Sequence, residues 1–205
     1  MLAFDLSPFV PPIEISKLFM QRLILIFTFL VFSTVLFAQP YKDSIKVQFS
    51  RYTDLIVNKE FSRSAEYINP EFFKIVPKAQ LIAIMEKTFD NPELDFKVEN
   101  PVILSIGDNN RIEGNNFVKL QYSNFLSMHF KQNNEVKQDT ALTKKALEAQ
   151  FGQDNVTYDS TTDTYKIFVI KNVIANSTNM RKWTFVVVEE KQKQILEKFI
   201  PKELL

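Results

Sequence analysis

Apolar residues recur at steps of three and four along residues 43–59, with charged residues on the other faces. This is the period of an amphipathic helix with one buried stripe. A shorter helix is predicted over residues 60–68, which ends before Pro70 because proline disfavours helical backbone in the residue before it. A third helix is predicted over residues 77–89, since proline suits the first helical position. The stripes of the first and third helices comprise Ile45, Phe49, Tyr52 and Ile56, and Leu81, Met85 and Phe89.

Beyond Pro92 the apolar period changes from near 3.6 to two, which indicates strands. Residues 94–98 alternate, residues 102–106 are apolar, and residues 107–116, rich in Asn and Gly, are predicted to turn into a long strand over residues 117–130. Successive strand side chains point to opposite faces. One face of the long strand carries Val118, Leu120, Tyr122, Leu126, Met128 and Phe130, and the other carries Lys119, Gln121, Ser123, Ser127 and His129. The apolar face is predicted to contact the helices.

The remaining pattern mixes one helix with short strands. Residues 131–138 are polar and are predicted to form a loop, and residues 143–151 a short helix with Gly152 after its end. Four strands joined by polar turns are predicted over residues 156–158, 165–175, 182–189 and 194–200. The second and third of these are apolar on both faces, so each is either a central strand covered on both sides or part of a subunit interface.

Three stretches carry a resemblance to a known superfamily. They are FSRSAEYINP at residues 61–70, KWTFVVV at residues 182–188 and a closing strand that ends in FIPKEL at residues 199–204. Three helices followed by about six strands in a strongly bent antiparallel sheet resemble the nuclear transport factor 2-like superfamily, also called cystatin-like or SnoaL-like. The resemblance covers residues 42–204 and implies an α+β cone with N-terminal helices packed on the sheet. Members include ketosteroid isomerase-like enzymes, dehydratases, polyketide cyclases and exported proteins, and the fold alone does not select among them.

An apolar segment, LILIFTFLVFSTVLFA, occupies residues 23–38 and follows Arg22. A basic start, an apolar run and a small residue before the cut are the features of a secretion signal. The alternative, a retained membrane anchor, normally needs about 20 apolar residues. Residues 1–19 contain three prolines and two acidic residues, unlike a signal start, so we expect translation to begin at Met20. The prediction is a signal over residues 20–38 and one exported domain over residues 39–205, periplasmic or secreted, without a stable membrane anchor after cleavage.

Composition removes several classes of function. The chain has 25 Lys and Arg against 24 Asp and Glu, a net charge of +1, which does not favour nucleic acid as a partner. Cysteine is absent, so the sequence offers no disulfide, no thiolate metal site and no lipoprotein cysteine. The three glycines do not form either common phosphate-binding loop. No cofactor is expected.

The sequence offers two candidates for a catalytic role, the single histidine and two tyrosines on apolar faces. His129 is the only histidine, and its position on the polar face of the long strand favours a solvated or interface residue over a catalytic base. Ketosteroid isomerase-like members use a carboxylate with a buried tyrosine and a protonated acid. Tyr52 and Tyr122 lie on apolar faces, but Asp54 and Glu60 lie off the helical stripe. The common role of such tyrosines is in a core, with the hydroxyl hydrogen-bonded at its rim.

A cavity between helices and sheet would favour an apolar ligand. The residues predicted to line it are Tyr52, Met85, Tyr122, Met128, Phe168 and Trp183. The leading hypothesis is a non-enzymatic exported domain that binds a small apolar ligand or a protein partner. The first alternative is an isomerase- or dehydratase-like enzyme with a pocket carboxylate near Tyr52 or Tyr122. The second is a structural domain that forms a homodimer through the sheet face carrying Phe125 and His129.

Overall fold

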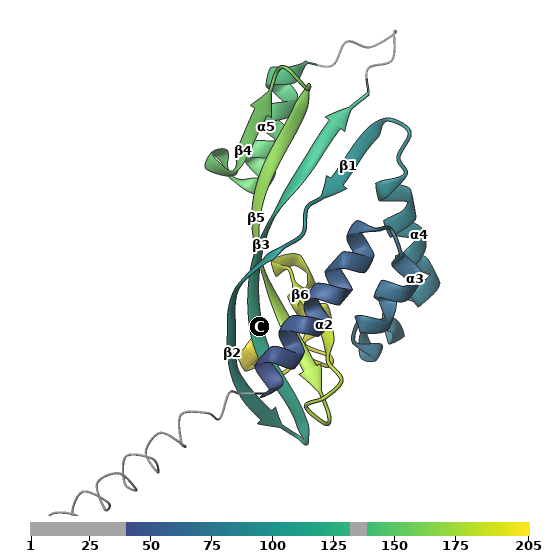
Figure 1. The fold of residues 1–205 in the computed structure, drawn as a ribbon, viewed down its shortest axis with the longest axis vertical. Coiled ribbons are helices and arrows are strands. Elements are labelled where there is room, and N and C mark those ends of the chain that lie inside the picture. Colours follow the sequence, from purple (N-terminus) through teal and green to yellow (C-terminus); the bar gives the residue numbers. More distant parts are fainter. Residues whose placement is uncertain (1–39, 132–138) are drawn as a thin grey trace, which may run out of the picture. The chain divides into compact units, whose positions relative to one another are not determined.

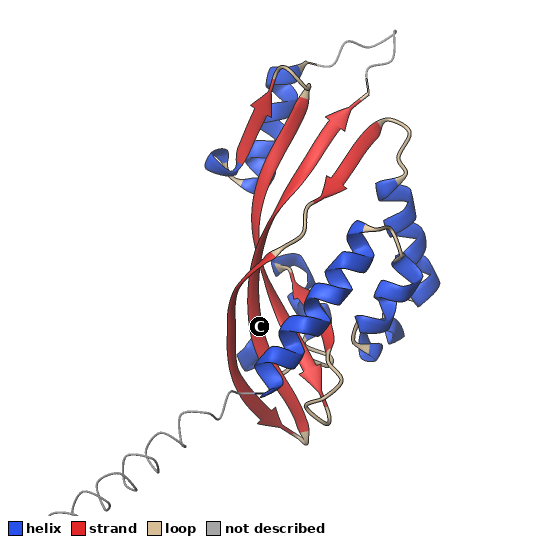
Figure 2. Cartoon of the chain, in the orientation of Figure 1, coloured by secondary structure: helices blue, strands red, loops and turns tan. Residues whose placement is uncertain are grey.

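The computed structural model describes residues 40–131 and 139–205. The predicted signal over residues 20–38 and nearly all of the predicted loop over residues 131–138 lie outside these residues. The described part is an α+β fold of five α-helices and a six-stranded antiparallel sheet that is not closed (Figure 2). The helices are α2 (Pro40–Val57), α3 (Phe61–Ser64), α4 (Lys78–Phe89), α5 (Thr140–Phe151) and α6 (Lys193–Leu196). The strands are β1 (Leu94–Val98), β2 (Val102–Ile112), β3 (Asn115–Phe130), β4 (Val156–Asp159), β5 (Thr164–Ser177) and β6 (Thr184–Val188).

Two long strands, β3 and β5, form the centre of the sheet and pair over most of their length, from Asn116 opposite Ser177 to Met128 opposite Tyr165. β2 and β1 pair with successive parts of β3 on its other side. In the same way, β6 and β4 pair with different parts of β5. Each outer edge of the sheet therefore consists of two short strands placed end to end beside one long strand.

The sheet turns over along its length. In Figure 1 the edge formed by β1 and β2 lies to the right of β3 at the top and to the left of it at the bottom. This is the accumulated strand twist expected of L-residues, here over unusually long strands. As a result, two helices that cover the same face of the sheet at opposite ends lie on opposite sides of the molecule in this view.

The face that carries the even-numbered residues of β3 is named here the inner face. At one end it packs against α2, whose Ile45, Phe49 and Tyr52 meet Val118 and Leu120 in the largest core cluster. At the other end it packs against α5 in a second cluster, which contains Leu147, Tyr165 and Ile167. The inner face was predicted to contact the helices, and these clusters confirm it.

The opposite face, named here the outer face, carries the odd-numbered residues of β3. Only one end of it has a core cluster, in which Phe117 and Ile174 pack against Leu196, Ile200 and Leu204 of the C-terminal segment. The remaining outer face leaves Phe125 and Ile170 exposed. The doubly apolar strands were predicted to be covered on both sides or to form an interface. β6 and the adjoining half of β5 are covered on both faces.

Both ends of α5 follow from local chemistry. The side chain of Asp139 accepts hydrogen bonds from the backbone N–H groups of Ala141 and Leu142, at 2.9 and 3.1 Å, which starts α5 earlier than predicted. Gly152 follows α5 with φ of +95°, a conformation that glycine adopts readily, as predicted from its position.

α2 is joined to the residue just before β6, because Gln48 Oε1 accepts a hydrogen bond from the backbone N–H of Trp183 at 2.9 Å.

Two predicted elements are wrong. The segment 194–200, predicted as a closing strand, forms α6 and a following turn, and the expected strand end at residues 199–204 contains a 3-10 helix, Lys202–Leu204. Leu196 and Ile200, four residues apart, both point into the core, which is a helical spacing. The turn predicted over residues 107–116 is mostly strand, since β2 continues to Ile112 and pairs with β3.

Candidate functional site

A cleft of about 190 Å³ opens on the inner face, in the part that neither α2 nor α5 covers. It lies at the waist of the sheet, defined here as residues 122–126 of β3 and residues 167–171 of β5, which pair with each other. The second half of α2 forms one wall, through Tyr52, Thr53 and Ile56. The cleft therefore results from two helices that cover the ends of a long sheet and leave its middle open.

The α2 side of the cleft is aromatic. The ring of Phe49 lies 5.2 Å from that of Tyr122 and 6.1 Å from that of Tyr52, measured between centroids. Tyr52 is also stacked on Phe185 at 5.8 Å. Burial raises the pKa of Tyr52, and the neighbouring Tyr122 raises it further. Burial raises the pKa of Tyr122 to about 12, with a smaller contribution from the charge of Glu189. Both phenols are therefore neutral hydrogen-bonding groups at physiological pH.

The inner face of β3 carries its even-numbered residues from 118 to 130. Among these described positions, polar residues occur only at the waist. Tyr122 lies opposite Lys171, and Asn124 opposite Val169. Lys171 Nζ is 2.7 Å from Glu189 Oε1, so the inward-facing cation has a carboxylate partner. These polar groups adjoin apolar cleft residues such as Leu126, Val169 and Val187.

Asn124 is the most informative of these residues. It is 8% exposed, lines the cleft, and its Oδ1 is buried without a hydrogen-bond partner in the described part of the chain. A buried amide oxygen without a donor costs about 1–3 kcal/mol relative to a satisfied one. Asn124 thus brings one buried acceptor without a described partner to a lining that is mainly apolar and aromatic.

The mouth of the cleft is formed where β1 gives way to β2. Val98, Glu99 and Pro101 line this side, and the backbone N–H of Glu99 donates to the carbonyl of Phe125 at 2.9 Å. Pro101 has no N–H to continue the ladder, which accounts for the break between the two strands. The Glu99 side chain is exposed, and Glu99 is the one acidic residue in the cleft's described lining.

Of the six residues predicted to line a pocket, the structure brings together Tyr52 and Tyr122. The other four lie elsewhere. Met85 is partly buried on α4, and Met128 packs in the α5 cluster. Phe168 lies on the outer face beside Phe125, and Trp183 is fully buried in the α2 cluster with its ring 6.4 Å from that of Tyr41.

The sequence analysis missed Asn124, Lys171, Glu189 and Glu99. A signal for the first two was present, because each is a polar residue at an apolar position of its strand's two-residue period. Glu189 directly follows the last valine of β6. No local pattern places Glu99 at the mouth, since its position depends on the break between β1 and β2.

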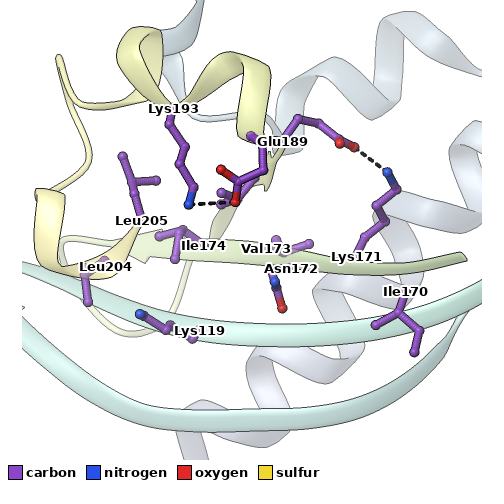
Figure 3. A pocket seen from close by; sticks show the side chains of 12 residues that line it. Lys119, Ile170, Lys171, Asn172, Val173, Ile174, Glu189, Lys193, Leu204 and Leu205 are labelled. Atoms are coloured by element: carbon purple, nitrogen blue, oxygen red, sulfur yellow. Dashed lines mark hydrogen bonds and ion pairs between the residues drawn. The ribbon is translucent and has the colours of Figure 1, made fainter. Parts of the chain in front are cut away.

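A second hollow, of about 350 Å³, lies beside β5 near the C-terminal segment (Figure 3). Figure 3 shows Lys171 and Ile170 pointing to opposite sides of β5, with Lys193 and Leu205 above and to the left. Lys193 pairs with Glu190 at 2.8 Å, and Lys171 with Glu189. This hollow is wider and more polar than the cleft, and it has no aromatic wall among its lining residues.

His129, the single histidine, lies away from the cleft. Its Nδ1 is 2.8 Å from the backbone carbonyl of Asp163, so the ring donates a hydrogen bond to the turn between β4 and β5. Within residues 40–131 and 139–205, no three acidic or histidine side chains converge to hold a metal ion. No helix in this described part is long and apolar enough to cross a membrane.

Comparison with protein-family models, curated proteins and solved structures gives no match. The chain's family is therefore not shown.

Proposed function

We propose that this protein binds a small, mainly apolar molecule in the waist cleft, without chemical change to it. The observation that carries the proposal is the unpartnered Oδ1 of Asn124 in an apolar, aromatic cleft. Natural proteins seldom leave a buried polar atom unsatisfied, and a ligand group is one explanation for such an atom. Small-molecule sites are typically apolar with a few placed polar groups.

The chemistry of the lining specifies the ligand class. Asn124 Oδ1 accepts a hydrogen bond, so the ligand must donate one, and the neutral phenols of Tyr52 and Tyr122 can donate to a ligand oxygen. A hydroxyl group satisfies both requirements at once. A volume of about 190 Å³ suits a single ring, because a cavity of about 150 Å³ accommodates benzene. The proposed class is therefore a compact ring compound with a hydroxyl group.

The test compares phenol with benzene as probes on the chain from residue 39 onward. Phenol should bind more tightly than benzene, by about tenfold, because only phenol can donate to Asn124. In Asn124→Leu this preference should disappear, while benzene binding is kept. Binding is measured by NMR shifts of the side chains of Leu126 and Val169. An unchanged phenol preference in Asn124→Leu, or no binding of either probe, would refute the proposal.

A second candidate is favoured by one observation, the Glu189 carboxylate that lies 2.7 Å from Lys171, a residue of the cleft lining, and whose charge contributes to the raised pKa of Tyr122. In an isomerase-like reaction, the Glu189 carboxylate would take a proton from the carbon next to a ketone. The neutral Tyr122 would donate a hydrogen bond to the enolate oxygen, and the proton would return to carbon. The Lys171 ion pair holds this carboxylate in place.

The enzymatic candidate is tested by deuterium exchange at the α-carbons of cyclohexanone in D2O. Exchange above the buffer rate that is lost in Glu189→Gln would support it. The matched control is Glu190→Gln, because Glu190 is the next residue, is exposed and pairs with Lys193 instead. Exchange at the buffer rate with the unmodified protein would exclude this reaction for the probe and leave binding alone.

Export and superfamily membership are also proposals. The apolar segment at residues 23–38 supports a cleaved signal, and the packing of N-terminal helices on an antiparallel sheet supports a nuclear transport factor 2-like relationship. N-terminal sequencing of the exported protein should give Gln39 as the first residue. A mature species that retains residue 10 would contradict both the cleavage and the proposed start at Met20.

A further inference from the structure

The described residues leave the middle of the outer face uncovered. The C-terminal segment packs on Phe117 and Ile174, at one end of this face. Beyond that end, apolar side chains are exposed on three neighbouring strands. Val102 of β2 is 63% exposed, Phe125 of β3 is 42% exposed and Ile170 of β5 is 52% exposed. The middle of the outer face therefore presents apolar groups to solvent.

These side chains form one patch because of the strand register. Val102 lies opposite Ser123, and Ser123 lies opposite Ile170 on its other side. Phe125 is the next residue of β3 on this face, and its ring packs on that of Phe168 at 5.3 Å between centroids. These five residues are named here the outer strip. A contiguous apolar patch of this kind marks an interaction site, whereas single exposed apolar residues do not.

The outer strip has a depression at its centre. Ser123 is only 7% exposed, whereas Val102 and Ile170 on either side of it are more than half exposed. The serine side chain is short, so these two side chains and that of Phe125 stand above it and shield it. A small residue surrounded by larger ones forms a hole that accepts a projecting side chain, as in the packing of one helix against another. The outer strip thus favours a partner with a protruding apolar residue.

Lysines border the outer strip at both ends. At one end, Lys97 of β1 and Lys166 of β5 lie on either side of Ser127. At the other end, Lys119 follows the strip on β3 and lines the hollow of Figure 3. The three lysines are exposed and have no ion pair within the described part of the chain. Charge complementarity therefore calls for acidic groups on the partner.

Two other occupants fit these charges and this shape less well. In a face-to-face dimer, the three lysines of one copy would meet those of the second copy, and like charges in contact are costly. The acids of this region offer little compensation, since Asp95 already pairs with Lys131 at 2.9 Å and Glu99 lies at the mouth of the cleft. A flat anionic membrane would be held away, because the C-terminal segment forms an additional layer on the same face. A separate protein with its own acidic residues fits better.

The dimensions of the outer strip suit an α-helix. Ser127 and Lys119 are eight residues apart on β3, which corresponds to about 26 Å at about 3.3 Å per residue. A helix that rises about 1.5 Å per residue spans this length with about 18 residues. The axes of β2 and β5 lie about 10 Å apart across β3, because neighbouring strands are about 4.8 Å apart. This width matches the helix diameter of about 10–12 Å.

We propose that an amphipathic helix of a partner protein binds on the outer strip, along β3. Its apolar stripe packs on the strip, with one large side chain seated over Ser123. Acidic residues near its two ends pair with Lys97 and Lys166 at one end and with Lys119 at the other. This is the mode of recognition in which a helix lays its apolar face into a groove. The site lies on the opposite side of the sheet from the ligand cleft and does not rest on the proposed ligand.

The probe is the peptide acetyl-EEALAQALAQLAQALAEE-amide, tested on the chain from residue 39 onward. Its leucines recur at steps of three and four and form one stripe, and its glutamates lie at both ends. NMR should detect binding through shifts of the methyl groups of Val102 and Ile170. The matched control peptide carries lysines in place of the glutamates. It should bind about tenfold more weakly, because attractions become repulsions, and added salt should reduce this difference.

Variants of the protein test the strip and its lysines separately. Ile170→Asp places a charge of the same sign as the glutamates in the strip and should weaken binding of the acidic peptide by about tenfold or more. The matched control is Leu142→Asp, because Leu142 is an apolar residue of α5 that is 66% exposed and lies outside the strip. It should leave binding unchanged within about twofold. The double variant Lys97→Glu with Lys166→Glu should remove the preference for the acidic peptide over the lysine peptide.

Three results of the peptide experiment would overturn the proposal: no binding of the acidic peptide, equal binding of both peptides, or equal weakening by Ile170→Asp and Leu142→Asp. Sedimentation of the protein without peptide tests the other occupants. A dimer that dissociates in Ile170→Asp would identify a second copy as the occupant. Binding to vesicles of phosphatidylglycerol and phosphatidylcholine that is lost in the same variant would identify a membrane. Either result would also overturn the proposal.

Discussion

The two ends of the sheet and its waist are built from the same strands but serve different purposes. At the ends, the inner face is covered by α2 or by α5, and residues such as Val118 and Tyr165 are almost completely buried. At the waist, the same face carries Tyr122, Asn124 and Lys171 and borders a cleft. Packing is continuous at the ends and is interrupted where the polar residues gather.

This difference shows how a long twisted sheet can place its packed core at the two ends and an open cleft between them. Each helix covers only the length of strand that it can follow before the twist turns the face away from it. The stretch between the two covers cannot be closed by either helix, so side chains there are not required to be apolar. The unsatisfied Asn124 and the exposed Ile170 both lie at this stretch.

The largest predicted effect tests whether stability resides at the ends. Ile45→Ala removes a side chain that is 0% exposed in the α2 cluster and does not line the cleft, so it should lower the free energy of unfolding by about 2–5 kcal/mol. The matched waist variant is Ile170→Ala, which should cost less than about 1 kcal/mol because the side chain is half exposed. Urea denaturation measures both. Similar losses in the two variants would remove the distinction between ends and waist.

The second effect concerns pH and the buried phenols. The pKa of Tyr122 in the folded state is about 12, above the ordinary value of about 10 for tyrosine. The unfolded chain therefore loses this proton first, so stability is complete below pH 10 and falls as the pH rises from 10 to 12. The loss from this residue should reach about 2–3 kcal/mol. Between pH 10 and 12 the thermal midpoint of Tyr122→Phe should fall less steeply with pH than that of the unmodified protein. An equally steep fall in both would mean that Tyr122 does not contribute this loss of stability.

Much of the fold was predictable from apolar periods, because α2 and β3 each bury one face, and the apolar stripes of α4 and β1 are less exposed than their other faces. The segment 194–200 was not, since its apolar residues lie in adjacent pairs that fit either period, and only packing on Phe117 and Ile174 selects the helix. β2 extends through Asn-rich sequence because pairing with β3 overrides weak local preference.

The site was less predictable than the fold. Tyr52 and Tyr122 could be placed because each lies on a buried face. Phe168 and Trp183 lie away from the cleft because of which parts of the twisted sheet the helices cover. That coverage is a long-range property, which local sequence does not give. Asn124 could have been found as the polar exception in an apolar row.

The third effect tests whether the waist gives up stability for binding. Asn124→Leu replaces an amide of nearly the same shape and removes the unsatisfied oxygen, so it should raise the free energy of unfolding by about 1 kcal/mol. Ser64→Ala at the packed end is the contrasting variant. There the hydroxyl donates to the Phe61 carbonyl at 2.9 Å, so its removal should destabilise. A loss of stability in Asn124→Leu would mean that the amide is satisfied in solution.

The smallest effect concerns the ion pair at the edge of the waist. The side chains of Lys171 and Glu189 are 28% and 43% exposed, so water and salt screen their attraction, and Lys171→Met should change the free energy of unfolding by less than about 1 kcal/mol. The substitution leaves Glu189 without its cation, so its negative charge should act more strongly on Tyr122. Spectroscopic titration of the phenols should then show a higher pKa for Tyr122, and Glu189→Gln should show a lower one. If both variants leave the titration unchanged, the charge of Glu189 does not reach the cleft, and the enzymatic candidate loses its carboxylate while the binding function is unaffected.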